Sequence, residues 1–186
     1  EEGDPIKYAY ANASSMGSDI LQNQNQVPAF MVWAIRDLKR APLDRVQIIK
    51  GWTELSGKPH EKFYDVACSD GRKANIKTGL CKDSRAKVNL SNCKISKNFG
   101  ADELKVVWKD PDFNPNLKAF YYVRVLENPT CRWSTWDAIK SGEKPRGDLP
   151  STIQERAWSS PIWYIPKQSE VEVIPLGGTI QLRNID

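Results

Sequence analysis

The segment at residues 118–127 constrains the fold more than any other part of the chain. Its sequence, KAFYYVRVLE, places apolar side chains on both faces of an extended strand. One face carries Ala119, Tyr121, Val123 and Val125, and the other carries Phe120, Tyr122 and Leu126. Such a strand is typical of the centre of a layered β structure, where protein covers it on both sides. Arg124, on the same strand, needs a hydrogen-bond acceptor if it is buried.

Further apolar runs predict strands along most of the chain. They lie at residues 6–10, 30–35, 43–53, 61–68, 86–90, 103–109, 162–165, 171–174 and 179–182. The run FMVWAI at 30–35 is apolar on both faces, as in a buried central strand. We expect hairpins joining 30–35 to 43–53, 103–109 to 118–127, and 171–174 to 179–182, because short turns separate the members of each pair. The strand at 118–127 is expected to be the longest.

Two short helices are expected near Trp136 and Arg156. Ser134 is a suitable N-cap for the first, and the T-x-x-E sequence at 152–155 is a capping box that would open the second through Trp158. The predicted fold is therefore mainly β, a two-layer antiparallel β-sandwich with two short helices. A chain of 186 residues is most simply a single β-rich domain, 1–186, with 165–186 as an appended hairpin.

Charge and composition limit the classes of partner. The net charge is +4, but Lys and Arg are dispersed among Asp and Glu instead of forming a basic stripe, so no nucleic-acid partner is expected. No stretch approaches the roughly 20 apolar residues of a membrane helix, so no membrane span is expected. Most of the seven tryptophans lie in alternating apolar runs, which indicates core positions, although exposed Trp can stack on sugars or bases.

The cysteines leave two interpretations open. They are Cys68, Cys81, Cys93 and Cys131. There is no C-x-x-C pair and only one histidine, so no metal site is expected in this chain. Either one disulfide staples the polar stretch at 69–98, which implies an oxidising compartment, or all four thiols are reduced. The sequence does not decide the pairing.

Four residues are candidates for catalysis, although none belongs to a complete catalytic motif. Asp19 ends the compact turn 16–19 (MGSD), where a lone Asp is more typical of a turn former. Cys131 would be a nucleophile if a base approached it, and Arg132 would favour its thiolate, but a buried structural thiol is the commoner role. Arg156, beside Glu155, is expected in an ion pair. The single histidine, His60, is typical of a solvated loop.

Several long motifs occur in an order that resembles one known family. They are YANASSMGSDI, PAFMVWAIRD, LDRVQIIKGWTE, HEKFYDVACSDG, LKVVWKDPDFNP, FYYVRVLENPTCRWSTWDA and TIQERAWSSPIWY. From about Tyr10 to Tyr164 the chain is similar to the C-terminal part of the domain of unknown function 3604 family. Members are large, often exported bacterial proteins. Their N-terminal portion resembles the polymerase-and-histidinol-phosphatase (PHP) type of metal-dependent hydrolase, with His-x-His and further His, Asp and Glu ligands.

The resemblance implies that residues 1–186 are the C-terminal part of a longer, periplasmic or secreted protein. Its partner would be the N-terminal metal-hydrolase domain of the same protein, which would hold a divalent metal, while this chain would hold no cofactor. The chain would then be an accessory domain of a (phospho)ester hydrolase and not catalytically complete alone. The family's Met-Gly-small-Asp turn corresponds to 16–19, and its Cys-Arg-Trp-Ser segment corresponds to 131–134. Both are carried over as contributors to a shared pocket.

Two further functions fit the sequence. A stand-alone carbohydrate- or protein-binding β-sandwich would use exposed tryptophans, with Trp133 and Trp136 as binding residues. It predicts that at least two of Trp52, Trp133, Trp136 and Trp163 are coplanar and accessible. A cysteine-based enzyme would depend on Cys131. The accessory-domain hypothesis predicts instead one large apolar face left exposed in the isolated chain.

Overall fold

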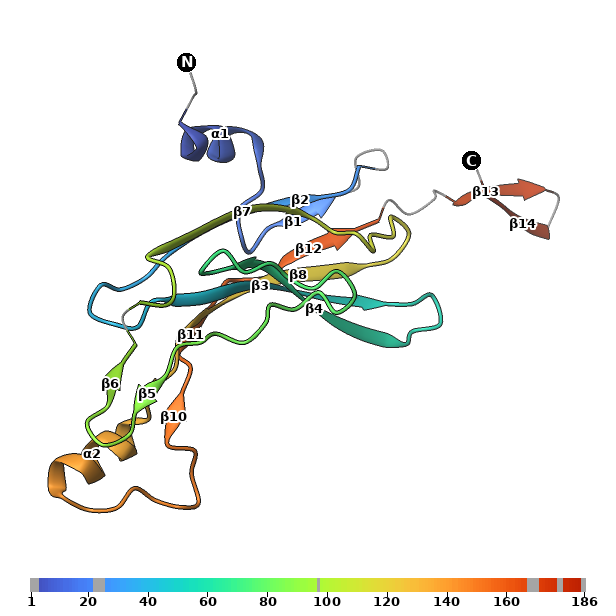
Figure 1. Cartoon of the computed structure of the whole chain (residues 1–186). Helices are drawn as coiled ribbons and strands as arrows, with labels where there is room; N and C mark the ends of the chain where they lie inside the picture. The colour runs from blue at the N-terminus through green and yellow to red at the C-terminus, as the bar shows by residue number, and fades with distance from the viewer. Residues whose placement is uncertain (1–3, 22–25, 97, 167–170, 177–178, 185–186) are drawn as a thin grey trace.

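The computed structural model describes residues 4–21, 26–96, 98–166, 171–176 and 179–184, and it is mainly β with two short helices (Figure 1). The larger layer is a six-stranded sheet in the order β1 (Asp19–Leu21), β12 (Ile162–Ile165), β8 (Ala119–Glu127), β3 (Leu43–Thr53) and β4 (Pro59–Cys68), with β11 (Arg156–Trp158) also paired to β8. The second layer is β2 (Ala29–Ile35) paired with β7 (Glu103–Lys109). These antiparallel sheets, packed on each other, confirm the predicted β-sandwich class; among the strands that the structure describes, only β1 and β12 pair in parallel.

Three pairs of short strands complete the described structure, all antiparallel. They are β5 (Val88–Asn89) with β6 (Lys94–Ile95), β9 (Thr130–Cys131) with β10 (Thr152–Ile153), and β13 (Val171–Leu176) with β14 (Thr179–Asn184). The pairing of β13 with β14 agrees with the expected strand pair near the C-terminus. Its connecting residues, 177–178, lie outside the described part of the chain.

The predicted central strand is confirmed. β8 pairs with β3 along one edge and with β11 and β12 along the other. Its inner face builds the core between the layers, where the Tyr121 ring lies 4.5 Å from the Phe30 ring of β2, centroid to centroid. Ile48, Ala119 and Tyr164 are buried in the same cluster. β8 is not the longest strand, because it has 9 residues and β3 has 11.

Two predicted hairpins are wrong. β2 pairs with β7, not with β3, because both edges of β3 are already occupied by β4 and β8. β7 and β8 are not paired with each other either, because both edges of β8 are occupied, one by β3 and the other by β11 and β12. They lie in different layers. The alternation of β7 was nevertheless predicted correctly, since Leu104, Val106 and Trp108 face inward.

The two helices lie partly elsewhere than expected. The run at 6–10 is not a strand but part of α1 (Pro5–Asn12), where the Asp4 carboxylate accepts a hydrogen bond from the N–H of Ile6 (2.9 Å) and proline stands in the first turn. α2 (Trp133–Ser141) was predicted, but its N-cap is Arg132, without a side-chain cap bond, instead of Ser134. The expected helix at 152–158 is absent, since this segment forms β10 and β11, whose backbone bonds to β9 and β8 outweigh the local capping signal.

Two disulfides tie the polar stretch at 69–98 to the sheet. Cys68 is bonded to Cys81, and Cys93 is bonded to Cys131. The interpretation with four reduced thiols is therefore wrong. The interpretation with one disulfide gives the right kind of bond but too few of them, because there are two. The first bond ties the middle of the polar stretch to β4, and the second ties a residue near its end to β9, directly before α2.

A charged network also links the beginning of this polar stretch to β3. The fully buried Asp44 carboxylate of β3 accepts hydrogen bonds from Arg45 and from Nη2 of Arg72 (2.6 Å). Arg72 also donates to the carbonyls of Ser69 (3.1 Å) and Lys82 (2.5 Å). This arrangement satisfies a carboxylate that would be costly to bury alone.

Candidate functional site

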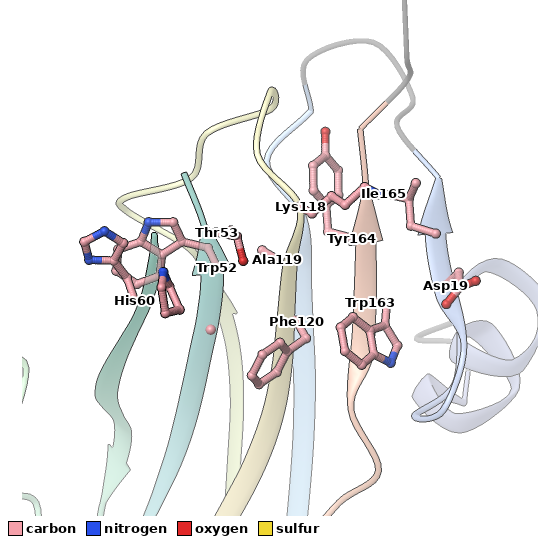
Figure 2. Close-up of a pocket in the computed structure, with 12 residues that line it drawn as sticks. Asp19, Trp52, Thr53, His60, Lys118, Ala119, Phe120, Trp163, Tyr164 and Ile165 are labelled. Atoms are coloured by element: carbon pink, nitrogen blue, oxygen red, sulfur yellow. The ribbon is translucent and has the colours of Figure 1, made fainter. Parts of the chain in front are cut away.

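An open groove of about 680 Å³ crosses one end of the six-stranded sheet (Figure 2). Residues of β1, β12, β8, β3 and β4 line it, so five strands contribute. Figure 2 shows Phe120 and Trp163 side by side near its centre, Asp19 beyond Trp163, and Trp52 with His60 at the opposite end.

Strand register sets the floor of the groove. Trp163 of β12 pairs with Phe120 of β8, and Phe120 pairs with Gly51 of β3. Because partners in register share a face, Trp163 and Phe120 lie together on the outer face of the sheet, away from the β2–β7 layer. Their ring centroids are 5.2 Å apart and the rings are inclined by 52°. Trp163 is 48% exposed, so its ring is accessible from the groove.

Gly51 gives the Phe120 ring its position. A Cβ atom at Gly51 would lie 2.2 Å from Cζ of Phe120, which means that the ring lies directly against the glycine backbone. Any larger residue would force the ring away. A glycine inside an apolar strand signals such a close approach, but its partner could be identified only once the pairing of β3 with β8 was known.

The turn predicted at 16–19 forms one end of the groove. Gly17 adopts a φ of +89°, and its N–H donates to the carbonyl of Pro161 (2.9 Å). The N–H of Trp163 donates to the carbonyl of Ser18 (3.1 Å). These bonds fix Asp19, the register partner of Trp163, at the edge of the groove. The turn therefore has the compact form predicted, and it brings one candidate residue to the groove.

A stacked pair forms the other end. The rings of Trp52 and His60 are 5.1 Å apart and inclined by 12°, and Nε2 of His60 lies 2.6 Å from Oε1 of Glu54. His60 thus belongs to β4, whereas the sequence analysis expected it in a solvated loop. No sequence pattern indicated this stacking, because the two rings meet only through the pairing of β3 with β4.

The Cys-Arg-Trp-Ser segment lies far from the groove. In Figure 1, α2 is at the lower left, well away from β1 and β12 in the upper centre. Cys131 is in a disulfide and has no free thiol, so the cysteine-based mechanism loses its nucleophile. Nε of Arg132 donates to the carbonyl of Pro150 (3.1 Å), which is a structural contact. Trp133 is 73% exposed, and Trp136 is also exposed, with Nζ of Lys140 lying 5.4 Å from its ring centroid.

Arg156 lies neither in the groove nor beside the Cys-Arg-Trp-Ser segment. It is on β11, opposite Leu126, and its Nε is 3.4 Å from the carbonyl oxygen of Gln154. The ion pair expected with Glu155 is not among the contacts of the described residues. The predicted candidates Asp19, Cys131, Arg132 and Arg156 therefore do not converge on one site. Phe120, Gly51 and His60 were not predicted as site residues.

The sequence model of the family described as "Protein of unknown function (DUF3604)" matches residues 1–166. The chain belongs to this family. No curated protein and no solved structure matches the chain.

This DUF3604 chain also contains a charged cluster between its layers. Nζ of the buried Lys50 lies 2.6 Å from Oδ2 of Asp110, which also accepts from the Tyr121 hydroxyl (2.8 Å). Burial raises the pKa of Tyr121, and the charge of Asp110 raises it further. Hydrogen bonds from Lys62 and Tyr64 lower the pKa of Asp112. Since these groups satisfy one another, the cluster anchors the loop at 110–117 and offers no unpaired acid or base.

The described residues of this DUF3604 chain provide no group of three His, Cys, Asp or Glu side chains that could hold a metal ion. None of the described helices is long and apolar enough to cross a membrane.

Proposed function

We propose that this chain is the accessory β-sandwich region of a metal-dependent (phospho)ester hydrolase and that it packs against the hydrolase portion of the same protein. The membership in the DUF3604 family supports this proposal. In the resemblance described above, the metal ligands belong to the N-terminal, PHP-like portion. The present chain would contribute packing surface, and it would not carry out the hydrolysis itself.

The observation that carries the proposal is the exposed outer face of the β2–β7 layer. Met31 and Val107 are register partners on this face and are 51% and 67% exposed, and Ile35 is 69% exposed. Trp33 is exposed beside them, and its Nε1–H donates to Glu103 (3.1 Å). We call the surface formed by Met31, Trp33, Ile35 and Val107 the β2–β7 outer face.

The sequence of β2 explains why this face needs a partner. The run FMVWAI is apolar on both sides, as in a strand covered twice, but the structure covers only the side that carries Phe30, Val32 and Ala34. An exposed contiguous apolar patch rimmed by charged residues is typical of a protein interface. A folded domain of the same protein is the partner that would cover it permanently.

The proposed compartment is the periplasm or the extracellular space. Two disulfides among the described residues are compatible with an oxidising environment, where such bonds persist.

Binding to the N-terminal hydrolase portion of a longer DUF3604 protein tests the proposal. Calorimetry of that portion with this chain should detect a complex, and Met31→Lys combined with Val107→Lys should weaken it at least tenfold. Leu55→Lys is the matched control, because Leu55 is an exposed leucine in the β3–β4 turn. The proposal fails if no complex forms or if the control weakens it equally.

Exposed tryptophans favour a second function, a stand-alone carbohydrate- or protein-binding module. Trp133 and Trp136 are exposed on α2, and Trp163 is exposed in the groove. Sugars that stack on an accessible indole should quench tryptophan fluorescence. An unchanged spectrum across a panel of sugars would remove the carbohydrate form of this hypothesis.

A further inference from the structure

We propose that the groove on the outer face of the six-stranded sheet binds a neutral oligosaccharide, with Trp163 as its stacking platform. This inference rests on the binding-module function and not on the docking of the β2–β7 outer face. The two surfaces lie on opposite sides of the sandwich, so each can be tested without disturbing the other.

A single cross-strand row defines the site. In register across five strands it contains Asp19, Trp163, Phe120, Gly51 and Glu61. Four interstrand spacings give the row a length of about 19 Å. That length suits a short oligosaccharide better than a single sugar ring. The side-chain order across the row is carboxylate, indole, phenyl, glycine and carboxylate.

The centre of the row offers apolar contact area that is accessible and fixed. The indole of Trp163 is half exposed and inclined to the Phe120 ring, so the two rings form a shallow apolar surface. The Phe120 ring lies over the backbone of Gly51, because this position has no side chain that would push the ring away. Flat aromatic rings bind the apolar C–H faces of sugars. Because the rings are held by strand pairing, binding would cost little ordering of the protein.

The ends of the row select for charge. Asp19 and Glu61 are exposed, and neither side chain has a hydrogen bond or ion pair with another described residue. Carboxylates accept hydrogen bonds from hydroxyl groups but repel phosphate and other carboxylates. Lys118 also lines the groove, so charges of both signs face a ligand there. A hydroxyl-rich, uncharged ligand can accept a hydrogen bond from Lys118 and donate to Asp19.

Calorimetry with defined sugars tests the inference. The probes are hexasaccharides of glucose (β-1,4-linked), xylose, mannose and N-acetylglucosamine, and the whole chain is titrated with each. At least one should bind, and Trp163→Ala should weaken its binding tenfold or more. Trp133→Ala is the control, because it removes an exposed tryptophan on α2, well away from the groove.

A second variant separates binding from folding. Asp19→Asn leaves the aromatic packing intact and should weaken the same sugar about threefold to tenfold, because a neutral amide oxygen accepts a weaker hydrogen bond than a carboxylate does. The inference is overturned if no probe binds, if Trp133→Ala abolishes binding, or if Asp19→Asn and a correctly folded Trp163→Ala both bind as well as the unmodified chain. Loss of hydrolase docking with intact sugar binding would instead contradict only the accessory-domain proposal.

Discussion

Asp44 shows how much one buried carboxylate can organise. It is inaccessible to solvent and accepts hydrogen bonds from Arg45, Arg72 and Gln154. Through Arg72 it holds the beginning of the polar stretch, and through Gln154 it holds the segment before β11. Two regions more than 80 residues apart in sequence therefore depend on the same side chain.

Asp44→Ala should lower the free energy of unfolding by about 3 kcal/mol, because it removes the carboxylate partner of the largely buried Arg72 and leaves Arg45 with Asp65 alone (3.6 Å). Urea denaturation followed by tryptophan fluorescence measures the loss. Asp148→Ala is the control, since the pair of Asp148 with Arg146 is exposed and its removal should leave the urea midpoint almost unchanged. Equal midpoints for the two variants would contradict the role given to Asp44.

Glu127 should make stability depend on pH. Burial raises the pKa of its carboxyl group, and the nearby Arg40 offsets part of this effect. The unfolded chain therefore loses this proton at a lower pH than the folded protein, so stability falls as pH rises from about 4 through the folded pKa.

Glu127→Gln removes that penalty, and its urea midpoint should exceed that of the unmodified chain at pH 7 but not at pH 4. Glu143→Gln, at an exposed position, should show no such difference. A variant that is less stable than the unmodified chain at pH 7 would show that the carboxylate is stabilising.

Sequence reasoning found the turn of Asp19 but not the row it belongs to. The turn signal is local, since Gly and Asp favour this geometry by themselves. The contact of Gly51 with Phe120 depends instead on the register of two strands nearly 70 residues apart. Likewise, Cys131 could not be recognised as a disulfide cysteine, because its partner Cys93 approaches it only in the folded chain.

At the scale of elements, periodicity predicted most strands but not their partners. β7 and β8 have the inward residues that their alternation indicated, since side-chain direction follows from strand geometry alone. Partner choice depends on which edges remain free, and β3 has none left for β2. The run at 152–158 shows the same limit. Its capping box favours a helix locally, but strand pairing with β9 and β8 outweighs that preference.

The two disulfides should contribute unequally to stability. They close chain segments with separations of 13 residues (Cys68 to Cys81) and 38 residues (Cys93 to Cys131). Loop-closure entropy gives contributions of about 3 and about 4 kcal/mol respectively.

Replacing Cys93 and Cys131 by Ala should therefore lower the urea midpoint more than replacing Cys68 and Cys81. Thiol titration of the unfolded, unreduced chain should find no free cysteine. A larger loss for the Cys68 and Cys81 pair would show that contacts within the polar stretch, and not chain entropy, dominate.

The whole molecule presents two different outer surfaces. The β2–β7 outer face is aliphatic with an exposed tryptophan, and the six-stranded sheet carries an aromatic groove with Asp19 at one end. The sandwich class was predictable because it follows from the number of apolar runs. The exposure of each outer surface was not, because an apolar run in a sequence does not reveal which of its sides remains uncovered.

The order of the cysteines divides the chain into two halves that are joined by the backbone but by no disulfide. Each disulfide closes its own loop and neither encloses the other, so no disulfide joins residues before 82 to residues after 92. Trypsin cleavage after Lys73 or Lys77 should leave one band on a non-reducing denaturing gel, whereas cleavage after Lys82 or Lys87 should give two. Yet each layer combines strands from both halves, β3 with β8 and β2 with β7. The two halves should therefore reassemble when produced as separate polypeptides, which would make this chain a split protein.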